Sequence, residues 1–341
     1  MEYEISPDYM PISPSALRTD TTVGCDIYLL AKTTIEVRFV LYCTADAVFD
    51  EAKKNMLVAQ KIKSLFIKKE EQQIFFDYLE NNFQHIISDT SIPADERTKI
   101  VHGAATNLVK DLFQDPRSGS VERTKAFAHN MVDYVIKDTN AAQSLMKIAV
   151  HEYYTYTHSV NVAAVGTLFG QNLGLGVTDL KGLCAGILLH DVGKTKISTE
   201  ILNKKGKLTK EEFEIIKKHP EYGAEVLNET GSQFKEERIV TLQHHENDDG
   251  TGYPLKLKGG NISYLAKCAK IIDEYDTLMS NNTNHDFVDR HFETLTMMIS
   301  QLKTRFDKQL LAQFVKFLAT KHGDANILNE FHKEKTYKLA V

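Results

Sequence analysis

Hydrophobic and polar positions follow different patterns in the first ninety residues and in the remainder of the chain. Residues 26–30 and 36–42 are short runs rich in β-branched and aromatic side chains, which predicts two strands. Residues 56–62 and 70–87 place apolar side chains at helical spacing, and residues 64–67 form a further short apolar run that predicts a third strand. The N-terminal part is therefore expected to be a small mixed α/β domain.

From about Ile92 onward the apolar positions follow the helical period, and no segment reads as a strand. Residues 115–120 contain a proline and a glycine that interrupt helix, so a helix pair from about Asp95 to Phe113 is expected to end there. We expect an α+β chain of three parts: a regulatory or partner domain over residues 1–90, a helical connector over 91–150, and an all-α helical bundle over 151–341.

Thr209 and Glu212 form a capping box in front of apolar positions with helical spacing. The box predicts that a helix begins at this point and places His219 near the C-terminal end of that helix.

The composition is typical of a soluble globular protein, since 42% of the 341 residues are hydrophobic and 26% are charged. No apolar run approaches the ~18 residues that span a bilayer, and the N-terminus lacks the basic and apolar regions of a signal peptide. The four cysteines are widely scattered, which favours reduced core thiols over disulfides or a thiolate zinc site. These observations predict a cytoplasmic protein without a membrane span.

The net charge of −5 argues against general binding of DNA or RNA. Between Lys194 and Lys218, however, eight lysines stand against four acidic residues. This run is either a solvated helical face or a rim that attracts a phosphorylated ligand, and charge alone does not distinguish the two.

Ten of the thirteen histidines lie from His151 onward, and several stand beside carboxylates. Potential metal ligands recur every 25 to 32 residues, about the length of one helix and its connection, so a helical bundle can direct them to one centre. These ligands are His158, His190, Asp191, His219, His244, His245 and Asp273.

Imidazole and carboxylate ligands without thiolate suit iron, manganese, nickel or zinc. Five imidazoles and two carboxylates exceed the four ligands of a structural zinc, and they would suit two metals bridged by Asp191. Two metals ~3.5–4 Å apart can hold a bridging hydroxide and polarise a phosphoryl oxygen, which is the arrangement for phosphodiester hydrolysis. Lys194 would then offset charge on the phosphate or position the nucleophile.

The chain resembles the HD-GYP family, a subgroup of the HD phosphohydrolases, from about His151 to Leu318. The resemblance rests on a series of motifs in the family's order. These are His158-Ser159-Val160-Asn161-Val162, Leu189-His190-Asp191-Val192-Gly193-Lys194, the segments 201–208 and 218–223, the run from His244 through Gly252-Tyr253-Pro254 to Ile262, the segment 273–278, and Phe306-Asp307.

The resemblance implies a helical domain that hydrolyses cyclic di-GMP to linear pGpG, and onward to GMP, with two or three metals that are often iron. It implies that His158, His190, Asp191 and Asp273 hold one metal, and that Asp191 bridges to a second metal held by His219, His244 and His245. It also places Lys194 beside the bridging solvent. The turn Gly252-Tyr253-Pro254 would lie next to the substrate pocket and is linked in the family to GGDEF-domain partners.

Two positions depart from the family pattern. Members with a third metal carry Glu four residues before the first histidine, where this chain has Tyr154, so a binuclear site is expected. The family's Arg-Pro-Tyr-Arg is replaced by residues 282–285, with Asn282 and His285 at the positions of the basic side chains. Losing a charge-assisted phosphate contact costs about 1.5–3 kcal/mol, unless Lys267, Lys270 or Arg290 compensates.

The leading hypothesis is therefore a metal-dependent cyclic di-GMP phosphodiesterase, with Lys194, the Gly-Tyr-Pro turn, Lys267, Asn282 and His285 as candidate substrate contacts. One alternative is a weakly active or inactive sensor or scaffold that binds a cyclic dinucleotide or a GGDEF-domain protein. The other is a hydrolase of a different cyclic dinucleotide. A homodimer is a further candidate assembly.

Overall fold

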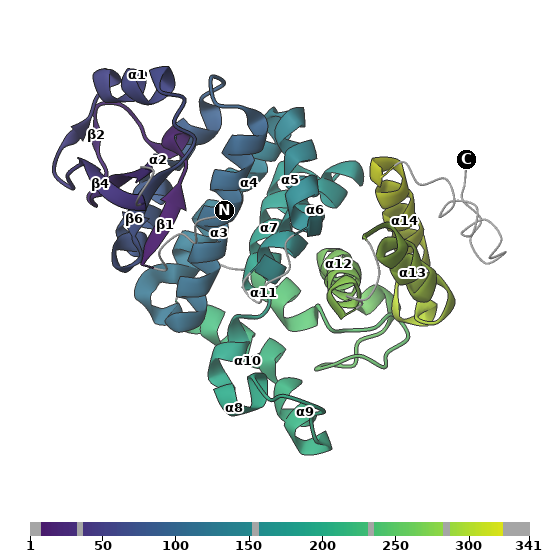
Figure 1. Ribbon diagram of the computed structural model, residues 1–341. Coiled ribbons are helices and arrows are strands. Elements are labelled where there is room, and N and C mark those ends of the chain that lie inside the picture. Colours follow the sequence, from purple (N-terminus) through teal and green to yellow (C-terminus); the bar gives the residue numbers. More distant parts are fainter. Residues whose placement is uncertain (1–7, 33–36, 152–156, 231–234, 282–286, 323–341) are drawn as a thin grey trace. The chain divides into compact units, whose positions relative to one another are not determined.

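The computed structural model describes residues 8–32, 37–151, 157–230, 235–281 and 287–322. They fall into two compact units, Met1–Asn107 and Leu108–Val341, whose boundary lies within the long helix α3 (Figure 1). The α+β class is confirmed, because a small region with strands precedes a helical domain. The division at residues 90 and 150 stays a prediction.

The N-terminal unit is built on a four-stranded antiparallel sheet in the order β1-β6-β3-β4. The central strand β6 is buried on both faces, because Leu65, Phe66 and Ile67 are all at most 3% exposed. This explains why it appears in the sequence as an uninterrupted apolar run. The strands of the unit are β1 (Tyr9–Ile12), β2 (Thr21–Thr22), β3 (Ile27–Lys32), β4 (Val37–Cys43), β5 (Val48–Phe49) and β6 (Leu65–Lys68).

The three predicted strands are confirmed as β3, β4 and β6, while β1 and the short pair β2 and β5 were not predicted. The helix predicted at 56–62 begins earlier, since Asp50 caps its first turn by accepting a hydrogen bond from the Lys53 amide. The helices of this unit are α1 (Glu51–Ala59), α2 (Gln72–Ser88) and the first part of α3 (Ala94–Gln114).

The predicted helix pair from Asp95 to Phe113 is wrong, because α3 is one continuous helix of 21 residues. The interruption predicted at 115–120 is present. Pro116–Ser120 forms an irregular turn in which Gly119 has a φ of 84°, a left-handed conformation that glycine adopts without a Cβ clash.

The C-terminal unit is a helical bundle with α6 and α7 at its centre. Residues 159–170 of α6 are all buried, and α7 contacts α4, α6 and α11. Its helices are α4 (Val121–Lys137), α5 (Thr139–His151), α6 (Thr157–Asn172), α7 (Val177–Leu189), α8 (Thr199–Leu202), α9 (Lys210–Ile216), α10 (His219–Glu229), α11 (Lys235–Gln243), α12 (Tyr264–Asn281), α13 (Phe287–Ser300) and α14 (Lys308–His322). Among the described residues, no helix is long and apolar enough to cross a membrane.

Candidate metal centre

His190 and Asp191 lie at the end of the most apolar helix of the bundle. α7 ends at Leu189, and the chain continues as the 3₁₀ helix η4 (Val192–Lys196). Leu189 and Val192 on either side are fully buried in one cluster with residues of α10, so the histidine and the carboxylate between them are held in the interior. The tight turn carries Lys194 back over Asp191, with Nζ 2.5 Å from Oδ2. The two side chains therefore meet although the α-helix has ended at Leu189.

His219 is the first residue of α10 and does not lie at the end of the capped helix α9, which stops at Ile216. A close crossing of η4 and α10 brings it to Asp191. A Cβ on Gly193 would lie 1.9 Å from the His219 carbonyl oxygen and 2.4 Å from the Gly223 amide nitrogen. Only glycine fits this position, and the crossing places His219 Nε2 3.3 Å from Asp191 Oδ1.

His244 and His245 follow the last turn of α11, and the Gly-Tyr-Pro turn folds back against them. A Cβ on Gly252 would meet the Asn247 amide nitrogen at 2.3 Å, so this close approach also requires glycine. The Tyr253 amide donates to the His245 carbonyl oxygen at 3.2 Å, and the Tyr253 ring lies 4.7 Å from the His245 ring. The turn thus covers one side of the histidine pair.

Glu246 holds the segment after the turn in place. Its buried carboxylate accepts hydrogen bonds from the Leu255 amide at 2.6 Å and the Leu257 amide at 2.8 Å. Hydrogen bonds to a charged acceptor are about twice as strong as neutral ones. Glu246 therefore acts as the structural anchor of the turn, a role that its position in the sequence did not reveal.

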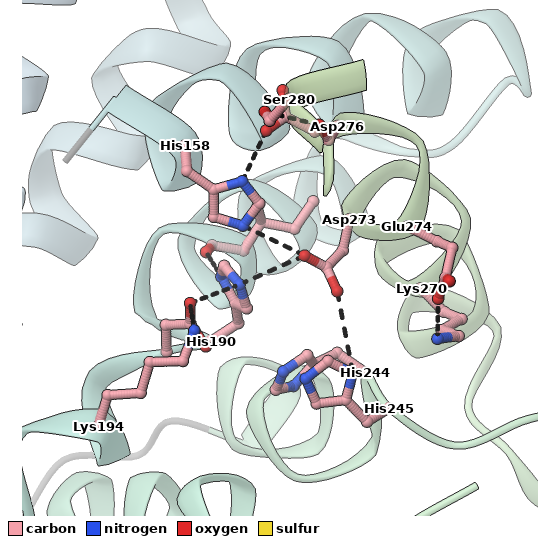
Figure 2. A network of polar contacts seen from close by, with 12 residues as sticks. His158, His190, Lys194, His244, His245, Lys270, Asp273, Glu274, Asp276 and Ser280 are labelled. Carbon is pink, nitrogen blue, oxygen red and sulfur yellow. Dashed lines mark hydrogen bonds and ion pairs between the residues drawn. The ribbon is translucent and has the colours of Figure 1, made fainter. Parts of the chain in front are cut away.

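His158 from α6 and Asp273 from α12 complete the cluster. His158 Nε2 lies 3.2 Å from Asp273 Oδ1, and its Nδ1 lies 2.6 Å from Asp276 Oδ2 (Figure 2). Asp273 in turn reaches His245 Nδ1 at 3.9 Å and His190 Nε2 at 3.9 Å. Asp273 therefore joins histidines from three different helix ends, while Asp276 orients His158 from behind.

Backbone hydrogen bonds fix the tautomers of three histidines. Nδ1 of His190, His219 and His244 lies 2.6, 2.8 and 2.8 Å from the carbonyl oxygen three residues earlier. A carbonyl oxygen only accepts, so each Nδ1 must donate its proton and each neutral ring directs the Nε2 lone pair inward. This pattern is typical of metal-ligating histidines, whose second nitrogen is held by a carbonyl or carboxylate.

The Nε2 atoms of His219 and His244 face each other at 3.1 Å. With both Nδ1 protons engaged, two lone pairs meet at hydrogen-bonding distance without a proton between them. Burial lowers the pKa of His219 to about 4 and the pKa of His244 well below its usual range, so protonation does not relieve the contact at neutral pH. A bound cation would do so.

The carboxylates of the cluster also fit a cation. Asp191 Oδ1 is buried and accepts no hydrogen bond from the residues that the structure describes. Burial opposes the ionisation of Asp191, but His190 and Lys194 beside it hold its pKa well below its usual range. Burial likewise opposes ionisation of Asp273, but the hydrogen bond from His158 and the nearby histidines hold its pKa well below its usual range. Two buried carboxylates thus stay ionised, and Asp191 Oδ1 has free acceptor capacity.

All seven predicted metal ligands come together in space. Three groups have ligand atoms within 4.8 Å of one another: His219, His244 and His245; His158, His190 and Asp273; and His190, Asp191 and His244. The third group shares His190 with the second group and His244 with the first, so Asp191 lies near one histidine of each. The bridging role of Asp191 stays a prediction. The donor set of imidazole and carboxylate is able to hold metal.

Two lysines proposed from the sequence to contact the substrate are already engaged in ion pairs. Lys267 forms ion pairs with Asp248 at 2.8 Å and Asp307 at 3.0 Å, so its charge is already balanced and the fold does not favour it as a phosphate contact. Lys270 is likewise held by Glu274 at 2.6 Å. Asn282, His285 and Tyr154 lie outside the described residues.

One lysine of the basic run 194–218 reaches the turn. Lys217 Nζ lies 4.9 Å from the centre of the Phe213 ring and 5.8 Å from the centre of the Tyr253 ring, and it also pairs with Glu214. Lys204 and Lys196 are paired with acidic residues. Lys196 and Lys204 of the run therefore belong to a charged surface, whereas Lys217 places a cation beside the Tyr253 ring.

Comparisons with known proteins identify a family and several relatives. The HD domain family matches residues 140–310. A cyclic di-GMP phosphodiesterase of Pseudomonas aeruginosa is 35% identical over 62% of this chain and 51% of its own length. A 3′3′-cGAMP-specific phosphodiesterase of Vibrio cholerae is 32% identical over 48% of this chain and 35% of its own length. The matched part thus spans about half or less of these curated relatives.

A solved structure shares the fold. An HDG"Y"P protein from Bdellovibrio bacteriovorus matches 91% of this chain and 99% of its own with a TM-score of 0.61 at 22% identity. The family match covers half of the chain and contains every residue of the histidine and carboxylate cluster. The chain therefore belongs to the HD domain family, in the HD-GYP group that its sequence motifs indicated.

Proposed function

We propose that this chain is a metal-dependent phosphodiesterase that opens cyclic di-GMP to linear pGpG and, in a second step, to GMP. The observation that carries the proposal is the contact between the Nε2 atoms of His219 and His244, two inward lone pairs 3.1 Å apart that a bound cation would stabilise. The relatives support the reaction class, since those compared above are named as phosphodiesterases of cyclic dinucleotides.

We assign the ligands to two metals. His158, His190 and Asp273 would hold the first, His219, His244 and His245 would hold the second, and Asp191 would bridge them. Iron is our first choice, with manganese, nickel and zinc as alternatives. When both are bound, the metals supply a hydroxide nucleophile and polarise the attacked phosphate.

The protein's own groups would then position the substrate. Lys194 is held over Asp191 and keeps its positive charge, because that carboxylate raises the pKa of the ammonium group although burial lowers it. A fixed cation here stabilises charge that develops on the phosphate. The Tyr253 ring forms a wall beside His245, and Lys217 lies at its outer edge, where it can contact the second phosphate.

A second candidate substrate is 3′3′-cGAMP, because a relative specific for that dinucleotide matches nearly half of the chain. The replacement of the family's basic residues by Asn282 and His285 also favours a changed substrate preference or slow turnover. We keep the GGDEF-domain partner at the Gly-Tyr-Pro turn and the homodimer as hypotheses.

The decisive experiment is product analysis with defined metals. The full chain is reconstituted anaerobically with iron or manganese and incubated with cyclic di-GMP or 3′3′-cGAMP, and the products are separated by chromatography. Asp191→Asn, which keeps the side-chain volume, should abolish turnover. Asp133→Asn serves as the matched control, because Asp133 of α4 is partly exposed and pairs with Lys181 of α7.

Linear pGpG that is absent with Asp191→Asn and present with Asp133→Asn supports the proposal. Faster turnover of 3′3′-cGAMP would transfer the proposal to that substrate. Binding of either dinucleotide without product, whichever metal is supplied, would contradict the proposed enzyme activity and indicate a sensor.

A further inference from the structure

A cavity in the N-terminal unit has the size and lining of a ligand site. Its volume is about 560 Å³, within the range of small-molecule pockets in proteins. One wall consists of Leu57, Val58 and Ile62, at the C-terminal end of α1 and just beyond it. This wall is aliphatic, and the one aromatic side chain of the lining, Phe49, is fully buried, so it does not offer a stacking face for a base.

The polar part of the lining is cationic. Lys54, Lys61 and Lys63 border the cavity and face a single carboxylate, Glu96, which already accepts a hydrogen bond from Ser13. Among the described residues, no ion pair engages Lys61 or Lys63. The cavity therefore combines an aliphatic wall with an excess of positive charge, and the complementary ligand has an aliphatic chain and an anionic head.

The backbone of Lys61 is a second observation on the same residue. α1 ends in a motif in which the Ile62 amide donates to the Leu57 carbonyl oxygen at 2.9 Å and the Lys61 amide donates to that of Val58 at 3.0 Å. The residue between the helix end and Ile62 must adopt the left-handed conformation, and Lys61 has a φ of 53°. Glycine is preferred at this position because it has no Cβ clash. Lysine occupies this position against the local conformational preference, and Lys61 is one of the residues that line the cavity.

We propose that this cavity binds a single-chain anionic amphiphile, with the aliphatic chain against Val58 and Ile62 and a carboxylate or phosphate head at Lys61 and Lys63. Val58 is 69% exposed, so its side chain is accessible to a ligand from solvent. The inference does not depend on the phosphodiesterase activity, because every lining residue belongs to the N-terminal unit.

The test uses the full-length chain and titration calorimetry with dodecanoate and dodecyl phosphate below their micellar concentrations. Both should bind, whereas dodecanol and dodecyltrimethylammonium should bind at least tenfold more weakly. Lys61→Gly is the informative variant, because it removes the positive charge and also removes the Cβ clash of the left-handed backbone conformation. It should weaken dodecanoate binding at least tenfold and leave the melting temperature unchanged or higher. Lys69→Gln, an exposed lysine outside the cavity lining, is the matched control.

Two measurements would overturn the proposal. One is equal affinity for dodecanoate and dodecanol, or for the wild type and Lys61→Gly. The other is the absence of binding to any monomeric amphiphile, even if the protein sediments with phosphatidylglycerol vesicles, since that would indicate a membrane surface contact. Binding of monomeric dodecanoate together with sedimentation on phosphatidylglycerol but not phosphatidylcholine vesicles supports the cavity and identifies a bilayer lipid as one source of the ligand.

Discussion

The crossing of η4 and α10 at Gly193 gives the sharpest prediction. One added methyl group should move His219 of α10 away from Asp191 and so disturb the proposed metal centre. In Gly193→Ala the new Cβ would lie 1.9 Å from the His219 carbonyl oxygen, and ordinary contact begins at 3.4 Å. The backbone of α10 must therefore retreat by about 1.5 Å, since neither partner is a flexible side chain. Overpacking of this kind costs about 1–3 kcal/mol, and a clash with backbone belongs at the upper end.

The same displacement acts directly on a proposed ligand, because the clashing atom belongs to His219 itself. Metal–ligand distances tolerate deviations of about 0.2 Å, so a shift of α10 should weaken the second metal on the order of a hundredfold or more. For a domain of this size, about 3 kcal/mol corresponds to a fall of roughly 6–12 °C in the melting temperature.

The assay measures the melting temperature of the metal-free protein and, separately, the metal content after reconstitution. Gly103→Ala is the control, since Gly103 lies inside α3 with no atom within 4 Å of the position of an added Cβ. It should stabilise the protein by about 0.5–1 kcal/mol, the advantage of alanine over glycine in a helix. A Gly193→Ala protein with wild-type melting temperature and full metal content would refute the reasoning.

Asp276→Asn should lower the affinity of the first metal by about 10–100-fold, measured by competition with a chelating dye, because it loosens the orientation of His158; unchanged affinity would contradict this role. Glu246→Gln should destabilise the protein by about 1.5–3 kcal/mol and speed amide exchange at Leu255 and Leu257, since two hydrogen bonds lose a charged acceptor; unaltered exchange would argue against the anchor. Removing metal with a chelator should lower the melting temperature, and adding metal back at 100 times its Kd should raise the free energy of unfolding by about 2.7 kcal/mol; a thermal unfolding transition that does not depend on metal would exclude tight binding to the folded state. Lys217→Ala should raise KM for cyclic di-GMP several-fold with kcat unchanged, whereas its exposed neighbour Lys218→Ala should not; equal effects would indicate general electrostatics.

Much of the fold and the composition of the site could be predicted from local features of the sequence. The strands β3, β4 and β6 and the change to helices after Ile92 follow from side-chain periodicity, which neighbouring residues determine. The seven predicted ligand positions were recognisable because imidazoles and carboxylates recur at helix-length intervals, and the structure does bring them together. β1 was missed, since a four-residue edge strand that contains Pro11 has too little pattern to distinguish it from a loop.

The tertiary structure decided which atoms face each other. Nδ1 hydrogen bonds to carbonyl oxygens determine that the Nε2 atoms of His219 and His244 converge, and no sequence pattern encodes a tautomer. Asp276 lies three residues after Asp273, but its role depends on α6 bringing His158 to within 2.6 Å. The predicted phosphate contact at Lys267 is disfavoured by its ion pairs with Asp248 and Asp307, which only the fold brings together. Residue types and spacings determine which chemistry is available, whereas packing across distant segments determines which charges are free to perform it.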